Sequence, residues 1–115
     1  MKAAANLVYS RAFSRRHLHE SDFLTKDEFA VIWKRAAGRC ELSGIALSMH
    51  GKEEGWQKHP WAPSLDRIDS RKGYVADNCR IVCVAVNIAL NEFGEEVLRR
   101  LSMAIVKGCD LTDMR

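Results

Sequence analysis

Two short segments separated by a turn-rich stretch constrain the fold of this chain more than any other feature. Residues 64–68 and 80–82 are short enough to be two β-strands, and Gly73 and Asn78 between them are residue types that favour turns. A helix is expected over residues 83–92, directly after the second segment. The middle of the chain is therefore predicted to form a strand, a turn, a strand and a helix.

Helical patterns flank this unit on both sides. Apolar residues and arginines recur over residues 3–18 with the spacing of a basic amphipathic helix. Thr25 and Glu28 have the form of a capping box, which predicts a helix over residues 26–37. Residues 95–106 form a third amphipathic pattern, with acids before bases as the helix dipole favours, and we expect this helix to serve as packing scaffold. The fold class that follows is α+β.

The length of 115 residues leaves room for one hydrophobic core. We therefore expect a single domain, with a basic helical part at residues 1–38, a central part at 40–92 and a C-terminal helix at 94–107. A hydrophobic content of 47% and a charged content of 29% are typical of folded globular chains. The apolar runs are too short to cross a bilayer and no signal peptide is recognised, so a cytoplasmic location is expected.

Positive charge is concentrated in the N-terminal third of the chain. Residues 1–40 carry eight Lys or Arg against four acids, whereas residues 41–115 carry ten against eleven. Because Lys and Arg near phosphates release condensed counterions, this asymmetry favours a polyanionic partner. A solvated helix face would have a similar composition, so the charge alone does not decide the function.

The central unit is rich in residues that carry chemistry. Asp66 on the first strand and Asn87 on the following helix both offer oxygen atoms, which hard cations such as Mg²⁺ prefer. A cation held there would stabilise the charge that develops on a phosphodiester during hydrolysis. A structural interpretation is also open, in which the aspartates cap turns and Arg67 and Arg80 are their salt-bridge partners.

Residues 64–82 read SLDRIDSRKGYVADNCRIV, and Asn87 follows five positions later. This run resembles the motif of the HNH (ββα-metal, His-Me finger) endonucleases, and in particular a phage and bacterial subset with Leu-Asp-Arg-Ile-Asp in place of the usual Asp-His. The resemblance covers about residues 40–92. It implies an α+β fold with a ββα-metal finger core and flanking helices, and an enzyme that hydrolyses DNA phosphodiester bonds with Mg²⁺ or Mn²⁺.

Position by position, the resemblance implies that Asp66 and Asn87 bind the divalent cation and that Asn78 ties the loop to the strand through backbone hydrogen bonds. Arg67 stands where most of the family has a histidine that acts as general base. A guanidinium remains protonated near neutral pH and cannot take that role, but it can hold the scissile phosphate through two hydrogen bonds. We therefore expect Arg67 to act as a phosphate clamp.

Another group must then remove the proton from the attacking water. His59 is the preferred candidate because it lies seven residues before Asp66, beside a Pro-Trp pair that would order the loop. His50, Tyr74 and a metal-bound hydroxide are the alternatives. An exposed histidine without a function is the structural alternative at both loop positions.

The chain has four cysteines, Cys40, Cys79, Cys83 and Cys109. Many relatives in the HNH family carry a four-cysteine zinc site built from two Cys-x-x-Cys pairs, which place thiolates at adjacent corners of a tetrahedron. Here Ser43 and Val86 stand where the second members of the pairs begun by Cys40 and Cys83 are expected. A structural zinc is therefore not expected, and the cysteines are interpreted as small buried apolar residues.

DNA is the expected partner, and the basic N-terminal third would contact its phosphates. A chain with one site would cut both strands only as a homodimer or through two successive nicks. The alternative interpretation is a catalytically inactive HNH-fold protein that binds nucleic acid or another nuclease.

Overall fold

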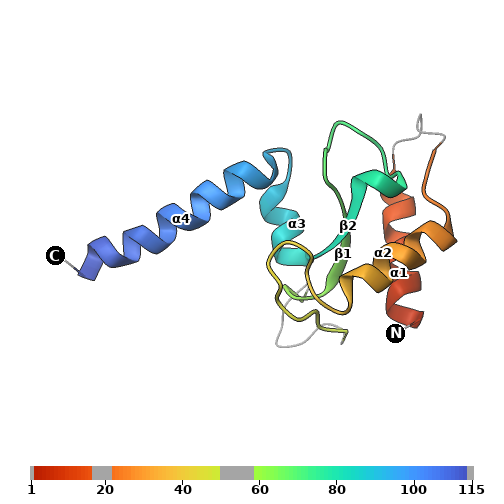
Figure 1. The fold of residues 1–115 in the computed structure, drawn as a ribbon, viewed down its shortest axis with the longest axis horizontal. Coiled ribbons are helices and arrows are strands. Elements are labelled where there is room, and N and C mark those ends of the chain that lie inside the picture. The colour runs from red at the N-terminus through yellow and green to blue at the C-terminus, as the bar shows by residue number, and fades with distance from the viewer. Residues whose placement is uncertain (1, 17–21, 50–58, 114–115) are drawn as a thin grey trace.

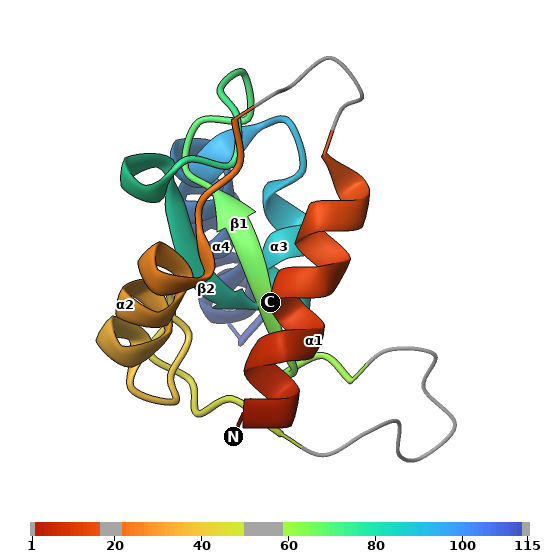
Figure 2. The ribbon, with the colours of Figure 1, turned by 90° about the vertical axis from the view of Figure 1, so that its right-hand side faces the viewer.

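The centre of the fold is a two-stranded antiparallel sheet (Figures 1 and 2). The computed structural model describes three stretches of the chain, residues 2–16, 22–49 and 59–113. Strand β1 (Pro63–Arg67) pairs with β2 (Cys79–Cys83), and Asp66 lies opposite Arg80 in the register. Helix α3 (Val84–Leu90) begins directly after β2. The predicted α+β class is confirmed, and the order strand, strand, helix is compatible with a ββα finger.

Two helices from the N-terminal third pack on this sheet. Helix α1 (Lys2–Arg15) contacts β1, and α2 (Lys26–Ala36) contacts β2 (Figure 2). The core between helices and sheet contains the buried side chains Val8, Leu24, Phe29, Ile32, Leu65 and Ile81. Burial of these apolar groups is the main force that holds the helices against so small a sheet.

The predicted capping box at the start of α2 is present. The Thr25 hydroxyl accepts a hydrogen bond from the Glu28 backbone N–H at 3.1 Å, and the Glu28 carboxylate accepts one from the Thr25 N–H at 2.8 Å. The helix ends at Ala36, and Ala37 takes the left-handed conformation with φ 52° and donates its N–H to the carbonyl of Lys34. Both ends of α2 are therefore set by local hydrogen bonds.

A turn after α2 covers the outer edge of β2. The Glu41 N–H donates to the carbonyl of Ile81 at 2.8 Å, and the Glu41 carboxylate accepts the Ile81 N–H at 2.7 Å. Arg35 of α2 holds the same carboxylate and also donates to the Cys79 carbonyl at 3.0 Å. The edge of β2 is thereby paired with a side chain and a turn instead of a third strand.

Helix α4 (Gly94–Asp113) extends away from the sheet and is longer than the predicted residues 95–106 (Figure 1). Val97, Leu101 and Ile105 are 47%, 56% and 60% exposed. The expectation that this helix serves as packing scaffold is wrong for the described part of the chain, because amphipathic periodicity shows that one face is apolar but not what covers it. Neither α4 nor any other described helix has the length and apolar character needed to span a bilayer.

Candidate functional site

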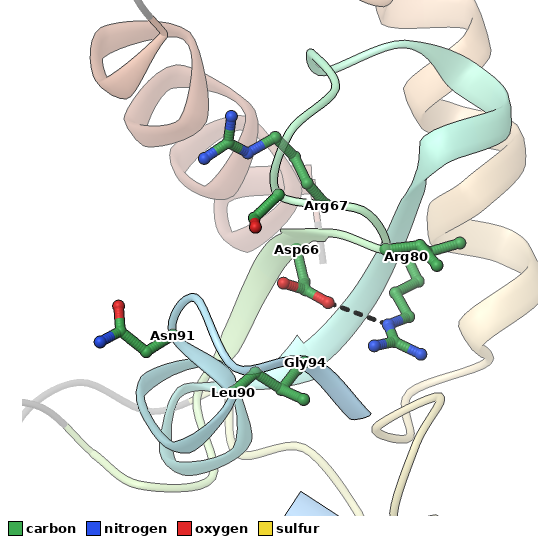
Figure 3. A pocket seen from close by; sticks show the side chains of 8 residues that line it. Asp66, Arg67, Arg80, Leu90, Asn91 and Gly94 are labelled. Atoms are coloured by element: carbon green, nitrogen blue, oxygen red, sulfur yellow. Dashed lines mark hydrogen bonds and ion pairs between the residues drawn. The ribbon is translucent and has the colours of Figure 1, made fainter. Parts of the chain in front are cut away.

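A small hollow lies at the end of β1, beside the connection between α3 and α4 (Figure 3). It is lined by Asp66, Arg67, Ile68, Ser70, Arg80, Leu90, Asn91 and Gly94. Its volume of about 20 Å³ is room for one water molecule or one ion, and is too small for an organic cofactor. Among these lining residues Asp66 is the only carboxylate, so the hollow combines one acidic group with two arginines.

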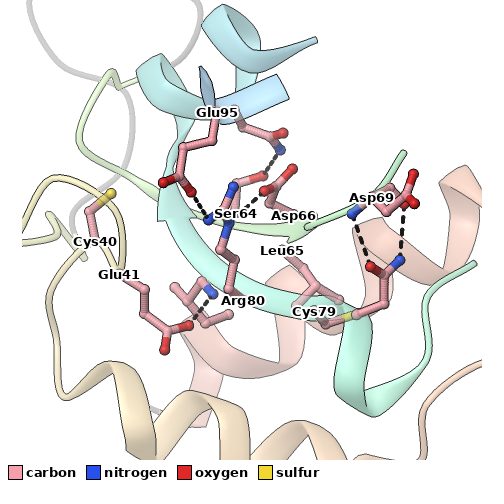
Figure 4. Close-up of polar contacts among 12 residues, drawn as sticks. Cys40, Glu41, Ser64, Leu65, Asp66, Asp69, Cys79, Arg80 and Glu95 are labelled. Atoms are coloured by element: carbon pink, nitrogen blue, oxygen red, sulfur yellow. Dashed lines mark hydrogen bonds and ion pairs between the residues drawn. The ribbon is translucent and has the colours of Figure 1, made fainter. Parts of the chain in front are cut away.

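Asp66 forms an ion pair with Arg80 across the two strands (Figures 3 and 4). Arg80 Nε donates to Asp66 Oδ2 at 2.9 Å, and the exposed fractions of the two side chains are only 12% and 9%. Arg80 Nη1 also donates to Glu95 Oε1 at 2.8 Å, and Arg99 Nε donates to Glu95 Oε2 at 2.8 Å. The Asp66 carboxylate is thus connected to the first turns of α4 through a charged network.

The charged groups of this network differ in the direction in which their surroundings shift the pKa. Burial raises the pKa of the Asp66 carboxyl above its ordinary value, although hydrogen bonding and charge from Arg80 oppose that shift. Burial disfavours the Arg80 cation, but its bonds to Glu95 and Asp66 outweigh this effect and raise the Arg80 pKa. The arginines hold the pKa of Glu95 below its ordinary value. The solvation that the Asp66 carboxylate loses thus exceeds what Arg80 returns, and a second cation beside it would be stabilised.

Asn78 fixes the loop that leads from β1 back to β2. Its amide oxygen accepts the Asp69 N–H at 2.9 Å, and its amide nitrogen donates to the carbonyls of Asp69 and Gly73, each at 3.0 Å. The side chain is buried, with 6% exposure. These are the loop-tying backbone hydrogen bonds that the resemblance implied. They leave Asn78 no obvious contact with a substrate, so its role is to position the loop.

Arg67 lines the hollow, but its side chain extends away from Asp66 (Figure 3). Its guanidinium lies over the ring of Tyr74, 5.1 Å from the centroid, and donates to the carbonyl of Lys72 at 3.3 Å. Adjacent residues of a strand point to opposite faces, which explains why Asp66 and Arg67 separate. The guanidinium beside Asp66 belongs to Arg80, so the role of Arg67 as a phosphate clamp stays a prediction.

Asn87 lies on the helix that faces β1. Its amide nitrogen donates to the hydroxyl of Ser64 at 2.7 Å. Ser64 and Asp66 are two residues apart on one strand, so both point to the face of β1 that Asn87 approaches. Asn91, one turn later, lines the hollow itself and has φ 39°, a value that is uncommon for residues other than glycine. Of these two amides, Asn91 lines the hollow and the predicted ligand Asn87 does not.

The structure does not bring His59 to the hollow. Its Nδ1 accepts the Trp61 N–H at 3.2 Å, and its carbonyl accepts the Ala62 N–H at 3.1 Å, in the turn that precedes β1. Asp66 lies near the opposite end of that strand, about 10 Å further along at the usual rise per residue. The proposal of His59 as general base therefore requires a movement that the structure does not contain.

Of the two alternative general bases, Tyr74 and His50, only Tyr74 lies within the described residues. Tyr74 is 6% exposed and packs in the core beneath Arg67, with its ring 5.5 Å from that of Phe23. His50 lies outside the described residues. Tyr74 is therefore a core residue in this conformation, and a role as proton acceptor has no support from its surroundings.

The cysteines occupy two separate clusters. Cys40 and Cys83 are buried together, whereas Cys79 is buried in the core with Ile81 and Leu65. The described part of the chain contains no group of three or more His, Cys, Asp and Glu residues arranged to hold a metal ion. Cys79 therefore does not complete a thiolate site with the other two, and the side chain of Cys109 lies outside the described residues.

Sequence reasoning missed the contribution of Glu95 and Asn91, and it listed Arg80 only as a salt-bridge partner in the structural interpretation. That pairing of Arg80 with Asp66 is present. A signal for it existed, because Asp66 and Arg80 become cross-strand neighbours once the register of β1 and β2 is known. No comparable signal in the sequence pointed to Glu95, because its contact with Arg80 depends on the direction in which α4 extends from the end of α3.

Comparison of the chain with protein-family models, with curated proteins and with solved structures found no match. The resemblance to HNH endonucleases therefore rests on the sequence pattern of the central unit.

Proposed function

We propose that the protein is a metal-dependent endonuclease that hydrolyses DNA phosphodiester bonds. The observation that carries the proposal is the buried Asp66 carboxylate in an ion-sized hollow at the end of a strand, strand and helix unit. A carboxylate this buried costs stability, and such groups are concentrated where chemistry needs them. The HNH-like sequence around Asp66 supplies the reaction class.

The residues at the hollow fit a hard divalent cation. Asp66 would provide a carboxylate oxygen. An amide oxygen would come from Asn91, which lines the hollow, or from Asn87 one turn earlier on α3. These are the donors that Mg²⁺ and Mn²⁺ prefer, and the volume of about 20 Å³ suits one ion. One bond from Arg80 leaves the carboxylate with further lone pairs. When bound, such a cation would stabilise the negative charge that develops on the phosphodiester.

The surroundings of the hollow favour a polyanionic substrate. Arg67 and Arg80 line it, and the loop that follows β1 carries Arg71, whose side chain is 88% exposed, and the exposed Lys72. Guanidinium groups hold phosphate oxygens through paired hydrogen bonds, so Arg67 and Arg71 would orient the DNA backbone beside Asp66.

One observation favours the second candidate, a nucleic-acid-binding protein without catalysis. Arg80 already neutralises Asp66 in part, and no described residue that lines the hollow is a histidine. A site of this kind could hold a phosphate through its arginines while lacking a group that activates water. The two candidates differ in whether bonds are broken.

A cleavage assay on supercoiled plasmid distinguishes the endonuclease from the binding protein without catalysis. Purified protein is expected to convert supercoiled DNA to nicked and linear forms with Mg²⁺ or Mn²⁺, and to leave it intact in EDTA. Binding is measured in parallel by gel shift in EDTA. Retarded DNA without cleavage under any divalent cation would reject the endonuclease and favour the binding protein. Identical cleavage in EDTA would reject the metal requirement.

The raised pKa of Asp66 predicts how cation binding depends on pH. A cation must displace the proton, so affinity should fall as pH decreases through a pKa that lies above the ordinary aspartate value. Arg80 lowers the pKa of Asp66, and Arg80→Gln should therefore move this loss of affinity to higher pH.

Calorimetric titration with Mn²⁺ at a series of mildly acidic pH values measures how the affinity depends on pH in the parent protein and in Arg80→Gln. Arg99→Gln, which removes a partner of Glu95 but not of Asp66, is the matched control. An acid limit that is the same in Arg80→Gln and in the parent protein would contradict the assignment of Asp66 as the titrating ligand.

A further inference from the structure

Cys40 and Cys83 come from distant parts of the chain and meet in a buried cluster with Val82. Their exposed fractions are 2% and 0%, both are free thiols, and Cys40 lies close enough to Cys83 to raise the pKa of the Cys83 thiol. Cys40 belongs to the turn that covers the edge of β2, and Cys83 is the last residue of β2. The contact therefore connects the turn to the sheet at a point where the two sulfur atoms are neighbours.

Backbone N–H groups lie near the sulfur atoms. The Ser43 N–H donates to Cys40 Sγ at 3.4 Å, and nearby backbone amides favour the thiolate form of each cysteine. Burial raises the pKa of the Cys40 thiol, but the hydroxyl and amide of Ser43 and the other donors outweigh burial and lower it below its ordinary value. Burial raises the pKa of Cys83. Cys40 is therefore the member of the pair with more thiolate character.

We propose that Cys40 and Cys83 are an oxidation site at which a peroxide closes an intramolecular disulfide bond. The two thiols are held in contact by the fold, so the bond-forming step is intramolecular and needs no second protein. This inference does not depend on the proposed nuclease function, because neither cysteine lines the hollow at Asp66.

The chemistry balances with hydrogen peroxide as oxidant. The Cys40 thiolate attacks one peroxide oxygen, the O–O bond breaks, and the departing hydroxide takes a proton to become water. The sulfur of Cys83 then attacks the sulfenic acid on Cys40, the S–S bond forms, the S–O bond breaks, and a second water leaves with the proton of Cys83. Two thiols lose two electrons, and the peroxide gains them.

Access to the pair requires a local opening of the chain, because both thiols are buried. Cys40 lies beneath the turn that contains Ser43 and Gly44, and both of these residues are exposed. A local opening of an exposed turn costs far less than global unfolding. Cys79 should not compete, because burial and the nearby Asp66 raise the pKa of its thiol to about 12 and it lies in the other cluster.

The test uses Cys109→Ser protein, which keeps both members of the pair and removes the cysteine outside the described side chains. It is treated with hydrogen peroxide under conditions that oxidise free cysteine completely, alkylated, and digested with trypsin. Cleavage after Arg and Lys separates the three remaining cysteines into peptides 40–52, 73–80 and 81–99. We expect a cross-linked product of peptides 40–52 and 81–99 that dithiothreitol separates, with the Cys79 peptide alkylated.

Cys40→Ser and Cys83→Ser in the same background are the matched controls. In each of these two variants the remaining cysteine of the pair should form no cross-link. Cys79→Ala should form the cross-link as the parent protein does. Three alkylated cysteines after peroxide treatment would overturn the proposal, and so would a cross-link that contains peptide 73–80. Sulfinic acid at Cys40 without a cross-link would also overturn it, because Cys83 would then fail to reach the oxidised sulfur.

Discussion

Asp66→Asn should reduce the rate of plasmid cleavage by about 10³-fold or more, while the protein stays folded. The amide has nearly the shape of the carboxylate, and its oxygen can still accept the hydrogen bond from Arg80 that the structure places at 2.9 Å. It lacks the negative charge that attracts a divalent cation, and loss of several kcal/mol of charge stabilisation corresponds to several decades in rate. Initial rates of nicking in Mg²⁺, with a thermal melt of each protein, measure the effect.

The matched control is Asp77→Asn, which removes an exposed carboxylate eleven residues further along the chain. It should cleave at the parental rate. Asp66→Ala is a less informative variant, because it leaves the buried Arg80 without its partner on β1 and would lower stability as well. Parental cleavage by folded Asp66→Asn protein would remove Asp66 from the site and with it the proposed function.

Asn78→Ala is expected to have the largest effect on stability, with a loss of about 2–4 kcal/mol in the free energy of unfolding. The substitution removes three hydrogen bonds from a buried amide and leaves the backbone groups of Asp69 and Gly73 without those partners. For a chain of this size the melting temperature should fall by about 10 °C or more. Thermal and urea denaturation followed by circular dichroism provide the measurement.

Asp77→Ala, at the exposed neighbouring position, controls for a general effect of substitution in the 3₁₀ helix η1 (Ala76–Asn78). It should change the melting temperature by only a small fraction of the shift seen for Asn78→Ala. If the two variants melt alike, the loop is held by contacts other than the Asn78 amide, and its position next to Asp66 needs another explanation.

The parts of the fold that depend on local sequence could be predicted. Strands β1 and β2 lie within one residue of the predicted bounds at each end, and the Thr25–Glu28 capping box starts α2 as expected. Both follow from short-range chemistry: turn residues limit the strands, and two side chains of the first turn satisfy the free N–H groups of a helix. The loop-tying hydrogen bonds of Asn78, which the resemblance implied, are also local, because its partners lie within nine residues.

The parts that depend on contacts between distant segments could not be predicted. Arg80 meets Glu95 because of the path from α3 to α4. Its pairing with Asp66 was one of the open interpretations of the sequence, but only the strand register selects Asp66 among the nearby aspartates. Arg67 and His59 show the same limit, because the sequence suggested contacts with Asp66 that the structure does not contain. Their positions in the sequence suggested a shared site with Asp66, but strand alternation turns Arg67 away, and the length of β1 separates His59 from the hollow.

The contacts at the margins of the sheet have a consequence for how this protein behaves at high concentration. The outer edge of β2 is occupied by Glu41, and on β1 the Leu65 carbonyl accepts a hydrogen bond from Arg15 Nη2 at 3.3 Å. Each exposed margin thus presents a charged side chain where an incoming strand would need free backbone groups. Sheet extension into cross-β fibrils should therefore require α1 or the Glu41 turn to detach first. Solution conditions that break these two hydrogen bonds are those under which aggregation would begin.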